Sequence, residues 1–226
     1  MTKNTADTRT ARLTAALEAP TASARLNAAM AAGMQPEPSD VEVLIARCTV
    51  EPDFYVRDML TWALTRHDAS STVEILLGEL TSSVTQARSQ ALHTLSKIGD
   101  RRAWPAITVE LLRDRNDDVA RAAWRAAVVL VPDDARSWLL DQLASQFGRG
   151  DRHTQLSLSR AFASLGEASL AVVERAKSSR DEGVRMHAVA TERYLRNPEE
   201  GFDAAIEQAR RVVALRGAPG VEQVEE

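Results

Sequence analysis

The feature of this sequence that most constrains its fold is an apolar pattern that returns about every 32 residues. In residues 117–130, small and aliphatic side chains follow one another at spacings of four, four and three, which places them on one face of an α-helix. That face begins at Val119 and ends at Leu130. Including Val119, such faces begin at Ala24, Val56, Ala87, Val119, Thr154 and Val184, at steps of 32, 31, 32, 35 and 30 residues.

Each of these helices has a predicted partner helix before it in the chain. The partner helices are predicted over residues 9–18, 39–49, 72–80, 134–147 and 167–176, with one more opening at Trp104 and Pro105. A pair this short cannot bury its own apolar sides, so the pairs must stack on one another. The sequence therefore predicts an all-α fold, an α-solenoid or superhelix of about six helical hairpins, with a C-terminal capping helix over residues 199–215.

The repeats are predicted to form one domain over residues 8–216, because no linker within this range is long enough to divide it. Residues 1–7 and the acidic tail, residues 217–226, have little to pack against, and we expect both to be disordered.

The fourth unit resembles a HEAT repeat of the short bacterial kind named after phycobilisome lyases. The resemblance rests on Gly99-Asp100, Arg102-Ala103, Pro105, Leu111-Leu112 and Asp117-Asp118-Val119. It implies a ladder of arginines one position after the start of each apolar face, where each arginine reaches across a turn to an acidic or carbonyl partner. This sequence has Arg25, Arg57, Arg88 and Arg185 at that position, but Gln155 in the fifth unit and Ala120 in the fourth.

The composition of the chain excludes or disfavours several kinds of partner and site. The formal net charge of −4 argues against nucleic acid as a partner, and the single cysteine, Cys48, excludes a disulfide or a multi-cysteine metal site within the chain. The sequence has no apolar run typical of a signal peptide or a membrane span, so we expect a soluble, cytoplasmic protein with no membrane partner.

The common catalytic motifs are missing from the sequence. It has no phosphate-binding loop, no GxGxxG, no HExxH, no CxxC and no GxSxG, and its four histidines lack the spacing of metal ligands. We therefore predict no catalytic residues, no metal and no cofactor, and favour a binding protein over an enzyme. His67 lies on an apolar face and is predicted to be a core histidine with satisfied hydrogen bonds.

The second helices of HEAT-like arrays usually line a concave binding face. At about 100° per residue, positions two, six and nine after the start of each apolar face point away from the core. These positions predict a binding stripe with Trp62 as an apolar anchor and arginines as charge readers. The predicted stripe consists of Trp62, His93, Arg121, Arg125 and Arg160, with Trp124 on its shoulder. In the alternative interpretation, Trp62 is packed beneath a loop and the arginines pair with neighbouring carboxylates.

Three functions are compatible with this pattern. The first is a non-catalytic scaffold or adaptor that binds a protein or peptide segment, with acidic or phosphate groups, on the concave face. The second is a DNA-binding protein resembling the HEAT-like glycosylases of alkylated bases, with Asp58, Trp62, Trp124, Arg121 and Arg125 at its site. The third is a bilin-lyase-like protein, which rests on the name of the repeat type alone.

Overall fold

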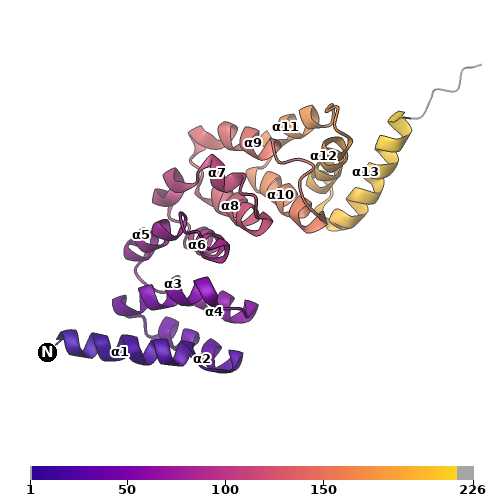
Figure 1. Cartoon of the computed structure of the whole chain (residues 1–226). Helices are drawn as coiled ribbons and strands as arrows, with labels where there is room; N and C mark the ends of the chain where they lie inside the picture. Colours follow the sequence, from indigo (N-terminus) through magenta and orange to yellow (C-terminus); the bar gives the residue numbers. More distant parts are fainter. Residues whose placement is uncertain (1, 218–226) are drawn as a thin grey trace, which may run out of the picture. The chain divides into compact units, whose positions relative to one another are not determined.

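The structure is a computed structural model that describes residues 2–217, and over these residues it consists of helices and turns with no strand (Figure 1). Contacts between residues divide the chain into two compact units that meet in sequence between Pro132 and Asp133. We call residues 2–132 unit 1 and residues 133–217 unit 2. The single domain predicted over residues 8–216 stays a prediction.

Unit 1 contains four helical hairpins. Its second helices are α2 (Ala22–Met34), α4 (Phe54–Leu64), α6 (Thr85–Ile98) and α8 (Asp117–Leu130), and each packs on the next. Its first helices are α1 (Thr2–Leu17), α3 (Val41–Val50), α5 (Ala69–Glu79) and the short α7 (Val109–Leu112), with the 3₁₀ helices η1 (Pro38–Asp40) and η2 (Arg101–Ala106) before α3 and α7. The helical hairpins predicted from the periodicity are confirmed in this unit.

Unit 2 contains two hairpins and a closing helix. The hairpins pair α9 (Arg136–Ala144) with α10 (Arg152–Leu165) and α11 (Ala168–Ala176) with α12 (Glu182–Arg196), and η3 (Asp133–Ala135) and η4 (Pro198–Glu200) precede α9 and α13. The closing helix α13 (Gly201–Gly217) packs along α12 and buries Phe202 and Ile206 against Val189. This arrangement confirms the predicted capping helix.

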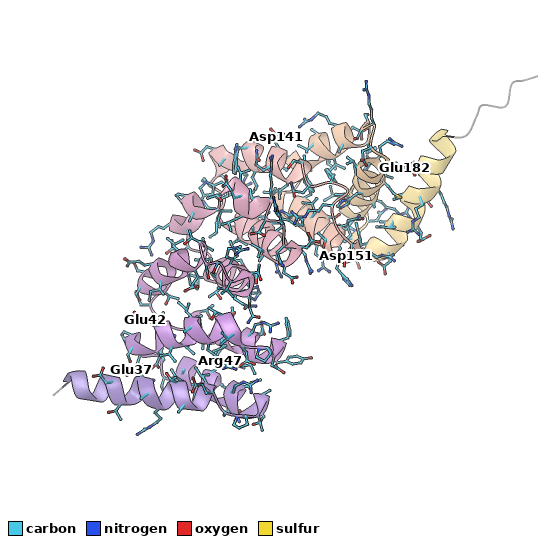
Figure 2. The ribbon with its side chains drawn as sticks, in the orientation of Figure 1. Glu37, Glu42, Arg47, Asp141, Asp151 and Glu182 are labelled. Carbon is cyan, nitrogen blue, oxygen red and sulfur yellow. The ribbon has the colours of Figure 1, made fainter. Side chains whose placement is uncertain are left out.

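Side-chain caps explain where most second helices begin. Asp53, Asn116, Asp151 and Asp181 each accept hydrogen bonds from backbone N–H groups of the first helical turn, which have no partner within the helix. Figure 2 shows Asp151 at the start of α10 and Glu182 in the first turn of α12, where a negative charge also favours the helix dipole. Helix α6 is different because Val84 precedes it and supplies no side-chain cap.

The repeated apolar faces form the core. All four residues of the face that begins at Val119 are fully buried, and Val56, Leu60 and Leu64 are buried on α4. Alanines at several of these positions let second helices approach closely, so that helix stacking rather than large side chains fills the interior.

The structure differs from the prediction at two first helices. The helix predicted to open at Trp104 and Pro105 is instead η2 followed by the four-residue α7. Pro105 has no N–H for a continuing α-helix, and the side chain of Thr108 caps a new helix by accepting from the N–H of Leu111. Helix α1 begins at Thr2, earlier than the predicted start at residue 9, and the disorder expected of residues 1–7 stays a prediction. Residues 218–226 of the predicted tail lie outside the described residues.

Within the described part of the chain, no helix has both the length and the apolar character that crossing a membrane requires.

Candidate functional site

The arginine ladder belongs to the framework: some of its members reach a carboxylate of the next hairpin, and others hold the turn of their own hairpin. Arg25 donates to both carboxylate oxygens of Glu51 at 2.8 Å, and Arg57 donates to the carbonyl oxygens of Glu51 and Pro52 at 2.9 and 2.8 Å. Arg88 donates hydrogen bonds to the carboxylate of Asp114 and to the carbonyl oxygen of Ser82. Arg185 donates to the carbonyl oxygens of Ser179 and Arg180. The ladder that the resemblance implied is therefore confirmed at these positions.

Glu51 accepts hydrogen bonds from several groups around the arginine ladder. Its side chain is fully buried and also accepts from Arg47 at 2.6 Å and from the N–H of Asp53 at 2.9 Å. Burial alone would raise the pKa of Glu51, but the hydrogen bonds from Arg25, Asp53 and Arg47 outweigh burial and lower the pKa to about 2. Glu51 is therefore charged at neutral pH and fully engaged in holding the framework.

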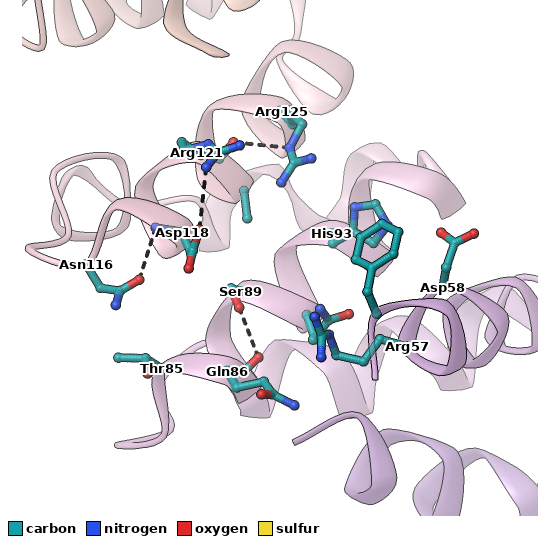
Figure 3. Close-up of a pocket in the computed structure, with 13 residues that line it drawn as sticks. Arg57, Asp58, Thr85, Gln86, Ser89, His93, Asn116, Asp118, Arg121 and Arg125 are labelled. Carbon is teal, nitrogen blue, oxygen red and sulfur yellow. Dashed lines mark hydrogen bonds and ion pairs between the residues drawn. The ribbon is translucent and has the colours of Figure 1, made fainter. Parts of the chain in front are cut away.

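A hollow of about 390 Å³ lies on the second-helix face of unit 1, near the amino-terminal ends of three successive second helices. Figure 3 shows side chains from α4, α6 and α8 around it. The lining residues are Phe54, Arg57, Asp58, Thr85, Gln86, Ser89, Gln90, His93, Asn116, Asp118, Arg121, Ala122 and Arg125. The structure thus brings together three residues of the predicted stripe, His93, Arg121 and Arg125.

The α8 side of the hollow is basic. Arg121 lies 3.6 Å from a carboxylate oxygen of Asp118, and its Nε is a buried donor with no acceptor among the described residues. Arg125 is exposed, and its Nε donates back to the carbonyl oxygen of Arg121 at 3.3 Å (Figure 3). A separation of 3.6 Å is too long for a good hydrogen bond, so Asp118 holds Arg121 only weakly.

His93 lies half-buried on the α6 side of the hollow. Burial, followed by the positive charges of Arg125 and Lys97, lowers the pKa of His93 to about 4, while the negative charge of Asp58 opposes this shift. His93 is therefore neutral at pH 7 and offers the hollow a polar ring rather than a third positive charge.

Trp62 lies on α4 outside the residues that line the hollow. It is 39% exposed, and part of its indole covers Gly33 of α2, where an added Cβ would come within 2.4 Å of the ring. Met30 and Met34 of α2 are also exposed. Trp62 is thus neither buried in the core nor fully exposed. We call Met30, Met34 and Trp62, the exposed apolar side chains of α2 and α4, the apolar strip.

Trp124 is a correction to the predicted stripe. It was expected on the shoulder of the exposed surface, but its side chain is fully buried and its indole N–H donates to the carbonyl oxygen of Leu112 at 2.9 Å. The helical period predicts only a direction around the axis of α8. However, α8 is covered by both α6 and α7, so the buried arc is wider than a single apolar face.

Arg160 is exposed on α10 of unit 2, at the same position of its repeat as Arg125. His67 is buried as predicted, and its Nδ1 is 2.8 Å from the carbonyl oxygen of Ala63, but its buried Nε2 has no partner among the described residues. Only half of the predicted hydrogen bonding of His67 is therefore present.

Phe54 and Gln90 line the hollow but were not predicted from the sequence, and Arg57 was predicted only as a framework residue. Phe54 is 65% exposed in the first turn of α4, and the Arg57 guanidinium lies 6.0 Å from the centre of its ring. An exposed aromatic residue directly after the cap Asp53 was a usable signal. The position of Gln90 depends on how α6 packs beside its neighbours, which a single helix pattern does not give.

Comparison with family models supports the repeat fold over part of the chain. A model of the family described as HEAT repeats matches residues 41–128, which include every residue that lines the hollow. No curated protein matches the chain significantly. The chain is similar to a solved structure, the complex of CpcE and CpcF of phycocyanin lyase from Nostoc sp. PCC7120, at 17% sequence identity and a TM-score of 0.47, over 93% of this chain and 89% of that chain. The HEAT-repeat prediction is thus confirmed over residues 41–128.

Proposed function

We propose that this HEAT-repeat chain is a non-catalytic scaffold that binds a segment of another protein across the second-helix face of unit 1. The observation that carries the proposal is the hollow shared by α4, α6 and α8, with the apolar strip of Met30, Met34 and Trp62 on the same face. Concave, partly polar surfaces next to exposed apolar side chains are typical of protein-binding sites.

The spacing of the helices favours a segment that crosses them. Asp58, Ser89 and Arg121 occupy the same position in three successive repeats and all line the hollow. Packed helices lie about 8–10 Å apart. An extended chain advances by about 3.3 Å per residue, so a crossing segment would present one side chain to each repeat about every third residue.

DNA binding is a weaker explanation of this face. Trp124, one of the two tryptophans in that hypothesis, is buried and cannot stack on a base. Asp58 and Asp118 lie among the arginines of the hollow and would repel a phosphate backbone. The proposal keeps Trp62, His93, Arg121 and Arg125 of unit 1 as contact residues. Arg160 of unit 2 is not part of this site, and its predicted role in binding stays a separate prediction.

Photocrosslinking in cells of the native host tests this proposal. A photoreactive amino acid replaces Gln90 in the hollow or, as the matched control, Glu74 on the exposed side of α5, and mass spectrometry identifies crosslinked proteins. We expect one protein to be captured from position 90 and not from position 74. Its purified form should bind the Trp62→Ala variant at least roughly tenfold more weakly, a loss of about 1.4 kcal/mol. Capture from position 74 alone would refute the proposed face.

A further inference from the structure

We infer that the hollow recognises a single carboxylate-bearing side chain, so that the bound segment is acidic through glutamate or aspartate rather than through phosphorylation. This inference rests on the proposed function and names the chemistry that the site reads.

The donors for a carboxylate come from two helices. Arg57 of α4 and Arg121 and Arg125 of α8 line the same hollow (Figure 3). Arg57 is anchored through Nη1 to two backbone carbonyls, while its Nε, like that of Arg121, is a buried donor without an acceptor among the described residues. Guanidinium groups match the planar, two-oxygen geometry of a carboxylate.

Arg121 is available because its present partner holds it weakly. The separation from Asp118 is 3.6 Å, and 79% of the Asp118 side chain is exposed. An exposed ion pair of this kind contributes about 0.2–1 kcal/mol, so an incoming carboxylate can replace it at little cost. The ladder arginine Arg25, in contrast, is held by two contacts of 2.8 Å to the buried Glu51.

The charge balance of the hollow fits one negative charge. Three arginines face two aspartates, Asp58 and Asp118, and His93 is neutral at pH 7, which leaves one excess positive charge. One carboxylate neutralises this excess. A phosphorylated side chain carries about −1.5 to −2 at pH 7, so it would leave uncompensated negative charge beside the two aspartates.

The walls also suit an acidic side chain with an aliphatic stem. Phe54 and Ala122 contribute apolar surface, while Ser89, Gln90 and Asn116 contribute polar groups. The methylene groups of a glutamate can lie against the apolar part while its carboxylate meets the arginines.

NMR titrations with three labelled peptides test the inference. The peptides share a Gly-Ser background and carry glutamate, glutamine or phosphoserine at every third residue. We expect the glutamate peptide to bind roughly tenfold more tightly than the glutamine peptide and at least as tightly as the phosphoserine peptide. Equal binding of glutamate and glutamine, or tighter binding of phosphoserine, would overturn the inference.

Three substitutions locate the effect. Arg121→Gln and Arg125→Gln should each weaken the glutamate peptide by roughly tenfold, while Arg101→Gln, an equal charge change at an exposed position of η2, should leave binding unchanged. Unchanged binding in both hollow variants would overturn the inference. Asp58→Asn should improve phosphoserine binding more than glutamate binding, because one of the two repelling carboxylates is gone.

The pKa of His93 gives a second test, because it should change when a carboxylate binds in the hollow and should not change if the arginines have only a structural role. Its ring faces Arg125 of α8, Lys97 of its own helix and Asp58 of α4. A bound carboxylate adds negative charge beside it and should raise its pKa above the value of about 4 in the free protein, as followed by the ring proton shifts.

If a partner crosslinks from position 90 but all three peptides bind equally, this inference fails while the proposed function stands. If capture occurs only from position 74, the proposed function fails.

Discussion

Units 1 and 2 are both built from helical hairpins, yet among the described residues the buried arginine and the buried carboxylates lie in unit 1. In unit 1, the buried Glu51 joins Arg25 and Arg47, and Arg88 pairs with Asp114 in the next repeat. In unit 2, the buried polar groups between α10 and α12 are neutral. Helical hairpins of the same kind can therefore be stabilised either by buried ion pairs or by a network of neutral hydrogen bonds.

His187 is the centre of the neutral network in unit 2. Its Nδ1 accepts from the N–H of Gly148 at 3.1 Å, and its Nε2 donates to the carbonyl oxygen of Gln155 at 3.0 Å. Ser159 and Thr191 lie 2.7 Å apart beside it. Burial lowers the pKa of His187 to about 4, although the Gln155 carbonyl favours the charged form.

The largest expected effect comes from breaking the charged framework of unit 1. Glu51→Ala removes the shared partner of Arg25 and Arg47 and should lower the free energy of unfolding by about 3–5 kcal/mol. Hydrogen exchange should lose protection in unit 1 and retain it in unit 2. Asp141→Ala, which breaks the exposed pair with Arg175 at 3.2 Å in unit 2, is the control and should cost about 1 kcal/mol or less. A loss no larger than that of the control would contradict the assigned role of Glu51.

The second prediction uses pH to separate the two units. Unfolded His187 takes up a proton near its ordinary pKa of 6.5, whereas folded His187 does so only near 4. Unfolding therefore takes up a proton in this range, and unit 2 should lose on the order of 3 kcal/mol of stability as the pH falls from 6.5 to 4.

Unit 1 should respond to acid at lower pH through Glu51. Because the folded-state pKa of Glu51 is lowered from 4.5 to about 2, its contribution is fully present above pH 4.5 and is lost as the pH falls toward 2. Urea titrations followed by NMR signals from each unit would measure both windows. His187→Gln should abolish the upper window in unit 2, and His93→Gln tests the smaller contribution of that half-buried histidine to unit 1. An unchanged upper window in the His187→Gln variant would refute the assignment.

The third prediction concerns the close contact between α2 and α4 at Gly33. A Cβ at Gly33 would lie 2.4 Å from Cζ3 of Trp62 and 2.8 Å from Cα of Ala63, so Gly33→Ala should cost about 1–3 kcal/mol. Gly78 lies in α5 with nothing within 4 Å of its Cβ position, so Gly78→Ala should stabilise the protein by about 0.5–1 kcal/mol. Thermal unfolding of the pair measures this difference, and effects of the same sign would be inconsistent with the described packing.

The smallest expected effect distinguishes face arginines from framework arginines within unit 1. Arg125→Gln changes an exposed residue of the hollow and should alter the free energy of unfolding by no more than about 0.5 kcal/mol. Arg25→Gln removes donors from the buried Glu51 and should be clearly destabilising in the same denaturation experiment. Equal losses from the two variants would show that Arg125 also belongs to the framework.

The sequence was sufficient for the second helices because their periodicity and caps are local properties. For example, the predicted face of α8 consists of Val119, Ala123, Ala127 and Leu130, and all four side chains are buried. Trp124 was placed wrongly because periodicity defines a direction around one helix axis, whereas burial depends on which neighbours cover that direction. Arg57 was identified as a ladder residue, but its second role beside the hollow needs the positions of three helices at once.

The connections of Glu51 also have a consequence for how this part of the chain assembles. Its side chain requires Arg25 from the hairpin before it, and its carbonyl oxygen accepts from Arg57 of its own hairpin and from Gln86 of the hairpin after it. A partly assembled array would leave a dehydrated carboxylate without its counter-ions. The three hairpins should therefore form and melt cooperatively, as one kinetic step, although repeat arrays in general can gain or lose single repeats at their ends.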